Sequence, residues 1–312
     1  MIYLFGEDQI IEELRKFTII RFNFDDDDFE RVNNLAEFFN YSFSGFDILV
    51  IDDEIKNNIT FNKILKKLAK KVKIIKVTDW YLSKILLIPP RLGKKLMNQK
   101  SCNPTKNMEF LLKRLADIIL SILILILSCP LFVVIAFLVH ITDKGPIFYR
   151  QKRTGYLGKE IIIFKIRSMK INAEKNDPIW AAQNDSRITK IGKFIRKTRL
   201  DELPQLISVI RGEMSLIGPR PERPLIEKDL LNNIPNYDLR HLIKPGLSGW
   251  AQVNFPYGAS IDDSYIKLGF DLYYIAKFSI FLDFIIFLKT IILVSTAKGS
   301  IPNNRLNNFF LE

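Results

Sequence analysis

The sequence predicts a small α/β unit followed by a membrane-anchored, α-rich (α+β) domain with a re-entrant membrane helix. Three observations predict this fold class. Short β-branched runs alternate with helical patterns over residues 1–80, a uniformly apolar run fills residues 115–141, and the chain after residue 145 consists of short apolar stretches separated by Gly, Pro, Arg and Lys. Because 312 residues exceed a single domain of about 100 to 200 residues, two cores are expected.

Residues 1–80 carry the α/β pattern. The runs typical of strands are IYLF, TIIRF, DILVIDD and VKIIKV, and the runs typical of helices are DQIIEELRKF, FERVNNLAEFF and FNKILKKLAKK. This alternation predicts a mainly parallel sheet. The first strand ends at a single Gly6, whereas a dinucleotide-binding fold needs three spaced glycines, so a regulatory or packing role is favoured. The acidic run at 25–28 indicates a solvated turn.

The predicted division of the chain has four parts. Residues 81–112 hold three prolines and scattered lysines, which is typical of a linker. The parts are a small α/β regulatory or packing domain at 1–90, a linker at 91–112, a re-entrant membrane helix at 113–142 and a cytosolic domain at 143–312.

Composition limits the classes of partner. The formal net charge is +12 and the sequence pI is about 9.5, which favours nucleic acid, anionic lipid or phosphorylated substrates. Cys102 and Cys129 lack the His and Cys neighbours of a zinc site, so neither a disulfide framework nor a metal knuckle is expected. The N-terminal residues lack a basic region followed by an apolar core, so no secretory signal is expected.

The apolar run at 115–141 predicts a membrane helix. Its polar members are Asp117, Ser121, Ser128 and His140. At about 1.5 Å per residue the run could cross a bilayer core of about 30 Å, which needs about 20 residues. Pro130 lies near the middle, where it removes a backbone donor and predicts a kink or break.

Basic flanks predict the course of this helix. Lys and Arg outnumber Asp and Glu over residues 91–114 and over residues 144–170, and basic residues favour the cytoplasmic side of a membrane. A helix that enters, bends at Pro130 and returns would keep both flanks inside, whereas a plain span, which stays an alternative, would not. A second apolar stretch near the C-terminus is interrupted by Asp283 and Lys289, which favours an interfacial or groove-packed helix.

Two adjacent carboxylates, Asp201 and Glu202, stand just before an apolar helical pattern. The pattern indicates a helix start, with either Thr198 as its cap or Pro204 in its first turn. The helix dipole and nearby cations should keep both carboxylates ionised. An ionised Asp can attack phosphorus and a neighbouring carboxylate can hold Mg²⁺. Adjacent acids at a helix start are, however, more often plain capping residues.

Further segments carry candidate phosphate ligands. Prolines and a glycine fix the backbone around Arg220, so its guanidinium is rigidly presented for a phosphate. Strand alternation puts Lys165 and Arg167 on one face. A tight turn ends in Trp250, which is expected in the core. For each of the three cations the alternative is a solvated side chain.

Taken together, these segments resemble the bacterial sugar transferase family. They are most similar to its monotopic polyprenyl phosphate phosphoglycosyl transferases, which begin the assembly of exopolysaccharide, capsule, O-antigen or glycoprotein glycans. The resemblance runs from about residue 113 to residue 299 and rests on ordered motifs. These are Lys113-Arg114, GPIFY at 145–149, QKRTG at 151–155, FKIRSM at 164–169, NDSRIT at 184–189, LDELPQ at 200–205, GPRPE at 218–222 and KPGLSGW at 244–250.

The resemblance implies a re-entrant helix, Mg²⁺ as cofactor and a nucleophilic aspartate. On this basis Asp201 forms a phosphosugar intermediate and Glu202 helps to hold Mg²⁺. The predicted substrate-binding residues are Arg196 and Arg220, which the resemblance implies, together with Lys165, Arg167 and Glu222.

The sequence departs from the family pattern at two positions. Cys129-Pro130 replaces a Ser-Pro pair at the expected helix break, with Ser128 one place early. Arg199 stands where the family usually has a small residue beside the dyad. The first departure puts a serine-based contact in doubt, and the second either alters phosphate contacts or adds a surface charge.

The predicted function is transfer of a sugar phosphate from a nucleotide sugar, with UDP expected, to polyprenyl (undecaprenyl) phosphate. The reaction would release UMP at the cytoplasmic face of the bacterial inner membrane and prime a surface glycan. A membrane-tethered nucleic-acid binder is one alternative, but the basic residues are interleaved with Pro and Gly instead of forming a helical stripe, so no nucleic-acid partner is expected. A catalytically silent scaffold is the other alternative. A homo-oligomer is among the partners considered.

Overall fold

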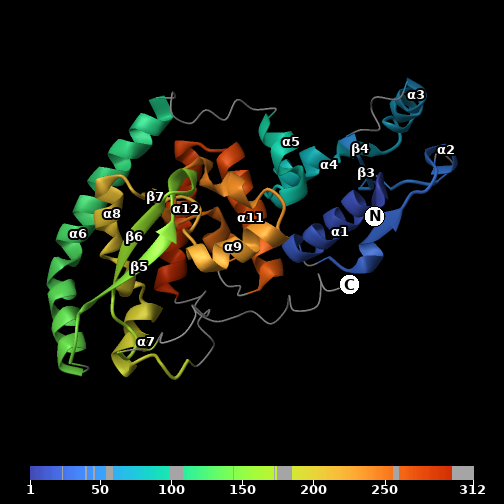
Figure 1. Cartoon of the computed structure of the whole chain (residues 1–312). Helices are drawn as coiled ribbons and strands as arrows, with labels where there is room; N and C mark the ends of the chain where they lie inside the picture. The colour runs from blue at the N-terminus through green and yellow to red at the C-terminus, as the bar shows by residue number, and fades with distance from the viewer. Residues whose placement is uncertain are drawn as a thin grey trace. The chain divides into compact units, whose positions relative to one another are not determined.

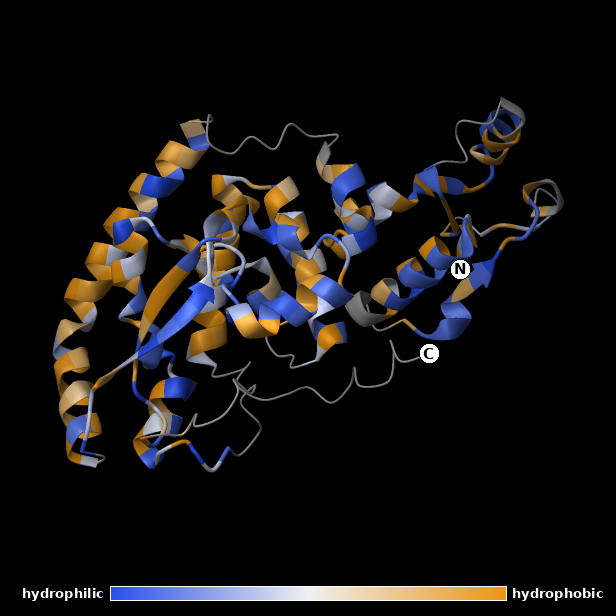
Figure 2. Cartoon of the chain, viewed as in Figure 1, coloured by the Kyte–Doolittle hydropathy of each residue, from blue (hydrophilic) through white to orange (hydrophobic). Residues whose placement is uncertain are grey.

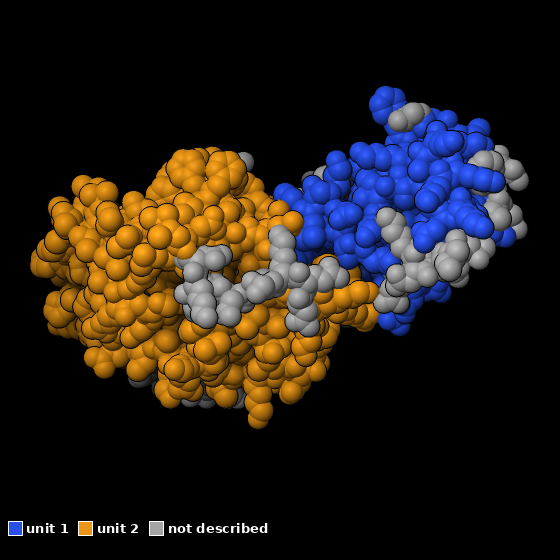
Figure 3. Space-filling model, turned by 90° about the horizontal axis from the view of Figure 1, so that it is seen from above, with its two compact units in different colours: residues 1–88, 304–312 blue, residues 89–303 orange. Residues whose placement is uncertain are grey.

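Two compact units make up the chain, one that contains residues 1–88 and one that contains residues 89–303 (Figure 3). The structure is a computed structural model that describes most of the chain. The residues outside the description are 23, 39–40, 45, 54–58, 99–107, 143, 172, 174–184, 256–259 and 297–312.

The first unit, which contains the labelled strands β3 and β4 in Figure 1, is built on a parallel sheet of four strands in the order β2-β1-β3-β4. This sheet confirms the predicted parallel α/β pattern. The strands are β1 (Ile2–Phe5), β2 (Phe29–Arg31), β3 (Ile48–Ile51) and β4 (Lys73–Lys76). The helices are α1 (Asp8–Phe22), α2 (Leu35–Phe38), α3 (Ile59–Leu68) and α4 (Val77–Trp80), with a 3-10 turn at Asp26–Asp28 and a π-helical turn at Tyr81–Ile85. Tyr3, Phe38 and Leu49 are buried in its core.

Two element assignments made from the sequence are wrong. The run TIIRF continues α1 instead of forming a strand, because Phe17 extends the buried stripe of Ile11 and Leu14 at helical spacing. Thr18 is also buried there, and its hydroxyl donates to the carbonyl oxygen of Leu14 at 2.7 Å. The start of the run FERVNNLAEFF forms strand β2, which pairs with β1. Periodicity alone does not distinguish short apolar runs of this length.

The second unit combines helices with two small sheets, as the predicted mixed fold requires. A hairpin joins β5 (Phe148–Thr154) to β6 (Glu160–Ile166), and β7 (Ser215–Ile217) pairs in parallel with β8 (Gly246–Ser248). The helices are α5 (Gly93–Asn98), α6 (Met108–Thr142), α7 (Lys190–Lys197), α8 (Gln205–Arg211), α9 (Pro224–Asn233), α10 (Trp250–Asn254), α11 (Ile261–Ala276) and α12 (Ile280–Ser295). Short 3-10 turns lie at Pro90–Leu92, Tyr156–Gly158, Leu200–Glu202 and Tyr237–Leu242.

The segment predicted as a linker begins as an ordered part of this second unit. Its α5 packs against α11, with Leu96 and Met97 buried. Asn236 donates a side-chain hydrogen bond to the carbonyl oxygen of Pro90 at 2.8 Å. The two apolar residues stand among lysines and near prolines. This composition is typical of a linker, so the helix was not predicted. Residues 99–107 of the predicted linker lie outside the described residues.

Helix α6 contains the predicted membrane segment. It is 35 residues long, and among the described residues it is the one helix that is long and apolar enough to cross a membrane. Figure 2, which colours the chain by residue hydropathy, shows that α6 consists mostly of hydrophobic residues. A kink or break was predicted at Pro130, and the helix continues through this residue without a break. A proline removes one backbone hydrogen bond, and a helix with many turns on either side retains its other bonds.

Candidate active site

The two candidate carboxylates lie in a tight 3-10 turn, Leu200–Glu202, between α7 and α8. Thr198 ends α7, and its hydroxyl donates to the carbonyl oxygen of Phe194 at 2.9 Å. Pro204 is the N-cap of α8. The sequence predicts either Thr198 at the cap or Pro204 inside the first turn, and the structure matches neither position. Asp201 and Glu202 therefore stand one turn before α8, in a short connection that helices fix at both ends.

Glu202 is buried beside two cations. Lys165 Nζ lies 3.1 Å from Oε1, Arg220 Nη1 lies 3.3 Å from Oε2, and Arg220 Nη2 also donates to Oε1. Burial alone would raise the pKa of Glu202, but the charges of Arg220 and Lys165 outweigh it and hold this pKa well below its usual range. Glu202 is therefore a fixed anion that orders both cations.

Asp201 is equally buried but lacks such partners. Its side chain is 6% exposed, and its Oδ1 has no hydrogen-bond partner among the described residues. Burial and the charge of Glu202 raise the pKa of Asp201 to about 6, against the opposing charges of Lys165, Arg196 and Arg199. The expected effect of nearby cations thus prevails at Glu202, whereas burial reverses the direction at Asp201. An unpartnered buried carboxylate oxygen is available to react or to bind.

The backbone around Arg220 is held by an unusually close pairing of β7 with β8. A Cβ atom added to Gly246 would come within 2.1 Å of the Gly218 backbone nitrogen, so glycine is required there. Arg240 Nη2 also donates to the Arg220 carbonyl oxygen at 2.8 Å. These contacts support the rigid presentation of the Arg220 guanidinium that the sequence predicts.

The structure separates the remaining candidates. Arg196 on α7 influences Asp201 electrostatically, and its Nη1 is buried without a hydrogen-bond partner among the described residues. Arg167 follows β6 and turns to Gly145, where an added Cβ would come within 2.4 Å of its Nη1. Glu222 accepts from Arg153 Nη1 at 3.1 Å and from the Arg223 backbone nitrogen, so it orders a neighbouring loop.

Three side chains of the long apolar helix α6 connect it to the elements around the dyad. Arg114 donates to the carbonyl oxygens of Val209 and Ile210, at 2.6 and 2.8 Å, and so caps the C-terminal end of α8. The Asp117 carboxylate accepts from the Ser215 hydroxyl at 2.7 Å. Lys113 pairs with Asp283 of α12 at 2.6 Å. The position of the dyad is therefore coupled to α6.

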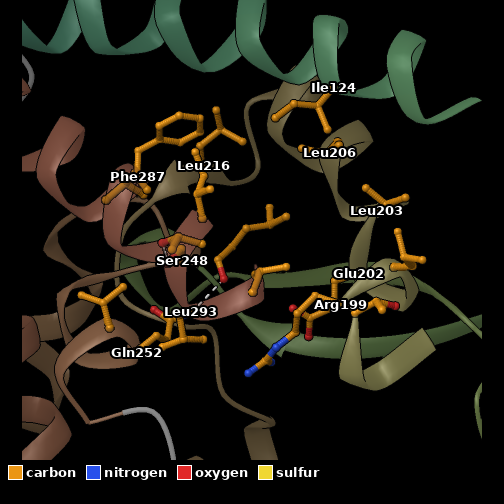
Figure 4. A pocket seen from close by; sticks show the side chains of 18 of the residues that line it. Ile124, Arg199, Glu202, Leu203, Leu206, Leu216, Ser248, Gln252, Phe287 and Leu293 are labelled. Carbon is orange, nitrogen blue, oxygen red and sulfur yellow. Dashed lines mark hydrogen bonds between the residues drawn. The ribbon is translucent and has the colours of Figure 1, made fainter. Parts of the chain in front are cut away.

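An apolar pocket of about 410 Å³ ends at Glu202 and Arg220. Figure 4 shows its walls, which come from α6, α8 and α12, with Arg199 and Glu202 adjacent on the side away from Phe287. The apolar lining residues are Ile124, Leu200, Leu203, Leu206, Leu216, Ile217, Leu247, Val253, Phe287, Ile291, Leu293 and Val294. A long apolar ligand with an anionic end fits this distribution of side chains.

Sequence reasoning missed a buried polar cluster behind Arg220. Arg240 Nη2 lies 2.9 Å from Asp271 Oδ2, and Arg240 Nη1 donates to the Tyr237 hydroxyl at 2.5 Å. Asp271 is 2% exposed. The available signal was Asp271 within the apolar run LGFDLYYIA of α11, because a buried acid requires a partner.

Comparison with known proteins completes the description of the site. The family model described as bacterial sugar transferase matches residues 108–297. A UDP-N-acetylgalactosamine-undecaprenyl-phosphate N-acetylgalactosaminephosphotransferase from Aeromonas hydrophila is 42% identical over 189 residues, 61% of this chain and 45% of the relative.

Two further relatives show the same likeness. A UDP-glucose:undecaprenyl-phosphate glucose-1-phosphate transferase from Klebsiella pneumoniae is 43% identical over 191 residues, 61% of this chain and 41% of the relative. A putative undecaprenyl-phosphate N-acetylgalactosaminyl 1-phosphate transferase from Bacillus subtilis (strain 168) is 46% identical over 129 residues, 41% of this chain and 72% of the relative. The chain thus spans less than half the length of the Aeromonas and Klebsiella proteins.

Proposed function

Since this chain belongs to the bacterial sugar transferase family, we propose that it transfers a sugar phosphate from a UDP-sugar to undecaprenyl phosphate. The reaction releases UMP and primes a surface glycan. The observation that carries the proposal is the unpartnered oxygen of Asp201 next to Glu202, which binds Lys165 and Arg220 and lines an apolar pocket. The names of the relatives support the lipid acceptor and the nucleotide-sugar donor.

The proposed reaction proceeds in two steps. An Asp201 carboxylate oxygen attacks the sugar-linked phosphorus of the donor, and the bond from that phosphorus to the bridging oxygen breaks, so that UMP leaves with the electron pair. A phosphate oxygen of the lipid then attacks the same phosphorus, which frees Asp201 and forms the lipid-linked diphosphate sugar. Arg220, Lys165 and Arg196 bind and orient the phosphates.

The direct test is to incubate the purified protein with Mg²⁺ and a panel of nucleotide sugars, with and without undecaprenyl phosphate, while UMP is measured. We expect at least one UDP-sugar to give a stoichiometric burst of UMP without lipid and continued turnover with it. No release with any donor would contradict the proposed function and favour a scaffold.

We propose Mg²⁺ as the cofactor, with Glu202 as its protein ligand. No group of three or more metal-binding side chains is found in the described part of the chain. The two carboxylates of the dyad nevertheless fit Mg²⁺, which commonly takes one or two carboxylates together with phosphate oxygens and water. When bound, the ion would neutralise charge on the donor phosphates.

Removal of the metal ion is expected to stop the first step. EDTA should lower UMP release by at least about tenfold, because the developing phosphate charge loses a counterion, and added Mg²⁺ should restore it. Glu202→Gln should require more Mg²⁺ for half-maximal release. An unchanged Mg²⁺ requirement in Glu202→Gln would remove Glu202 as the ligand.

We also propose that α6 is re-entrant, with both ends on the cytoplasmic face of the inner membrane. Near one end Asp117 binds β7, and near the other Ile135 and Val139 pack with Ile166 and Ile195. The segment of α6 between these two sets of contacts, residues 117–139, is about 33 Å long at about 1.5 Å per residue. A perpendicular span would therefore carry α7, with its exposed lysines, into the hydrocarbon core.

The other face of α6 supports the same placement. Its exposed apolar side chains include Ile119, Ile122, Ile126, Leu127, Val133 and Phe137, and α12 exposes Phe281, Phe284 and Ile292. These surfaces would be in contact with lipid, whereas the opposite face of α6 is covered by protein.

Cysteine labelling checks this topology. In a background with Cys102 and Cys129 replaced by serine, Glu109→Cys and Lys144→Cys should both react with an impermeant maleimide only from the cytoplasmic side. Asp229→Cys, exposed on the second unit, is the matched marker for the side of the catalytic domain. Reaction of the two helix-end cysteines from opposite sides would establish a plain span instead.

A further inference from the structure

Arg199 is the residue whose backbone and side chain the proposed reaction leaves unexplained. It precedes the dyad and adopts the left-handed region, with φ 59° and ψ 15°. Its backbone nitrogen donates to the Arg196 carbonyl oxygen at 3.3 Å, and its carbonyl oxygen accepts from the Glu202 nitrogen at 3.2 Å. A non-glycine residue rarely adopts this conformation, which tends to occur where the surroundings impose it, often at functional sites. The chain reverses sharply here and places the Arg199 side chain on the pocket wall (Figure 4).

The charge of the Arg199 guanidinium acts on the dyad from a distance, without direct contact. The guanidinium forms no hydrogen bond or ion pair with any described residue, whereas Arg220 is bound to Glu202 and to the Leu247 carbonyl oxygen. The charged residues that line the pocket are Arg199, Glu202 and Arg220. Glu202 and Arg220 offset one another, so Arg199 leaves the wall with one net positive charge beside a mainly apolar lining.

We propose that Arg199 anchors the phosphate of the lipid acceptor, with the polyprenyl chain lying along the apolar pocket walls. This inference rests on the proposed function and assigns Arg199 to its second step. A guanidinium binds a phosphate monoester through two parallel hydrogen bonds, and a partly desolvated site strengthens them. The donor phosphates are instead bound by Arg220, Lys165 and Arg196 around Asp201. Arg199 thus presents the attacking lipid phosphate to the phosphosugar on Asp201.

The test separates the two steps of the reaction. Arg199→Ser should raise the KM for undecaprenyl phosphate by about tenfold, which is the usual scale for one charge-assisted hydrogen-bonded contact. The lipid-free burst of UMP should keep its rate and amplitude, as should kcat at saturating lipid. Arg199→Lys should recover part of the affinity because it keeps the charge. Lys197→Ser, which removes an exposed cation two residues away, is the matched control and should leave the KM unchanged.

Uncharged undecaprenol provides a second measurement. As a competitive inhibitor it should bind wild type and Arg199→Ser equally, because it occupies the apolar walls without a phosphate. A lipid KM that is unchanged in Arg199→Ser, or a slower lipid-free burst, would overturn the assignment, the latter by moving Arg199 to the donor. Failure of the proposed function differs from failure of the Arg199 assignment, because wild type itself would then release no UMP.

Discussion

Asp201→Asn is expected to abolish turnover, with a loss of about 10,000-fold or more, the scale seen when a covalent nucleophile is removed. The amide is nearly isosteric with the carboxylate, so the buried turn should keep its shape while the attacking oxygen loses its charge. Since Asp201 Oδ1 has no hydrogen-bond partner in the described part of the chain, the substitution breaks no hydrogen bond at that atom.

The measurement is retention of label from a UDP-sugar carrying ³²P at the sugar-linked phosphate. Wild type should release UMP before lipid is added and retain the label, and Asp201→Asn should do neither. Asp229→Asn makes the same chemical change on the exposed surface of α9 and should behave like wild type. A labelled Asp201→Asn protein, or strictly sequential kinetics in wild type, would move the nucleophile elsewhere.

The electrostatics of the dyad support the different roles that we propose for its two members. Two adjacent buried carboxylates repel one another, so the site can ionise one of them far more easily than the other. Arg220 and Lys165 both bind Glu202 and lower its pKa, whereas the pKa of Asp201 is raised to about 6. A carboxylate with a raised pKa is the more basic of the two, and it is the one without bound cations. Glu202→Gln should therefore still allow slow labelling of Asp201.

The sequence predicted the local features of the candidate site better than its tertiary arrangement. Asp201 and Glu202 are neighbours in the chain, so they are close in space whatever the fold. Arg220 was predicted because prolines restrict its backbone locally. Lys165 and Arg167 looked equivalent from strand alternation, but β6 ends at Ile166, and the next side chain turns to Gly145. The end of a strand depends on pairing partners, which a single sequence does not show.

The direction of the Asp201 pKa shift could not be predicted for a related reason. The cations near Asp201 in sequence are visible, but its burial depends on β6 and α7, which pack around the 3-10 turn. The same limit applies to the Arg240 and Asp271 pair, whose members are thirty-one positions apart. Desolvation and long-range pairing are tertiary properties, whereas adjacency, charge and proline content are local ones.

Arg240→Met is expected to destabilise the protein by about 3 to 5 kcal/mol near neutral pH, because it leaves a buried carboxylate without its partner cation. Asp271 is almost fully buried, and its acceptor contact with Arg240 Nη2 at 2.9 Å would be lost. Asp271→Leu combined with Arg240→Met removes both charges, so the double variant should be markedly more stable than the single one.

The effect has a predictable pH dependence. Burial raises the pKa of Asp271 to about 6 in the folded protein, and Arg240 opposes this rise, so loss of Arg240 should raise the pKa further. The folded state then binds a proton that the unfolded state releases, and stability falls as pH rises above the unfolded value of about 3.9. Chemical unfolding of the protein in nanodiscs should therefore show a smaller penalty for Arg240→Met at pH 5 than at pH 7.5.

The double variant also separates stability from positioning. Because Arg240 donates to the Arg220 carbonyl oxygen, its loss frees the backbone that positions the Arg220 guanidinium. We therefore expect the double variant to recover much of its stability yet to show a UMP burst slower than wild type by about tenfold, the scale of one lost orienting contact. A burst at the wild-type rate would show that Arg240 only neutralises Asp271. If the double variant were as unstable as Arg240→Met, the unpaired charge of Asp271 would not be the cause of the instability.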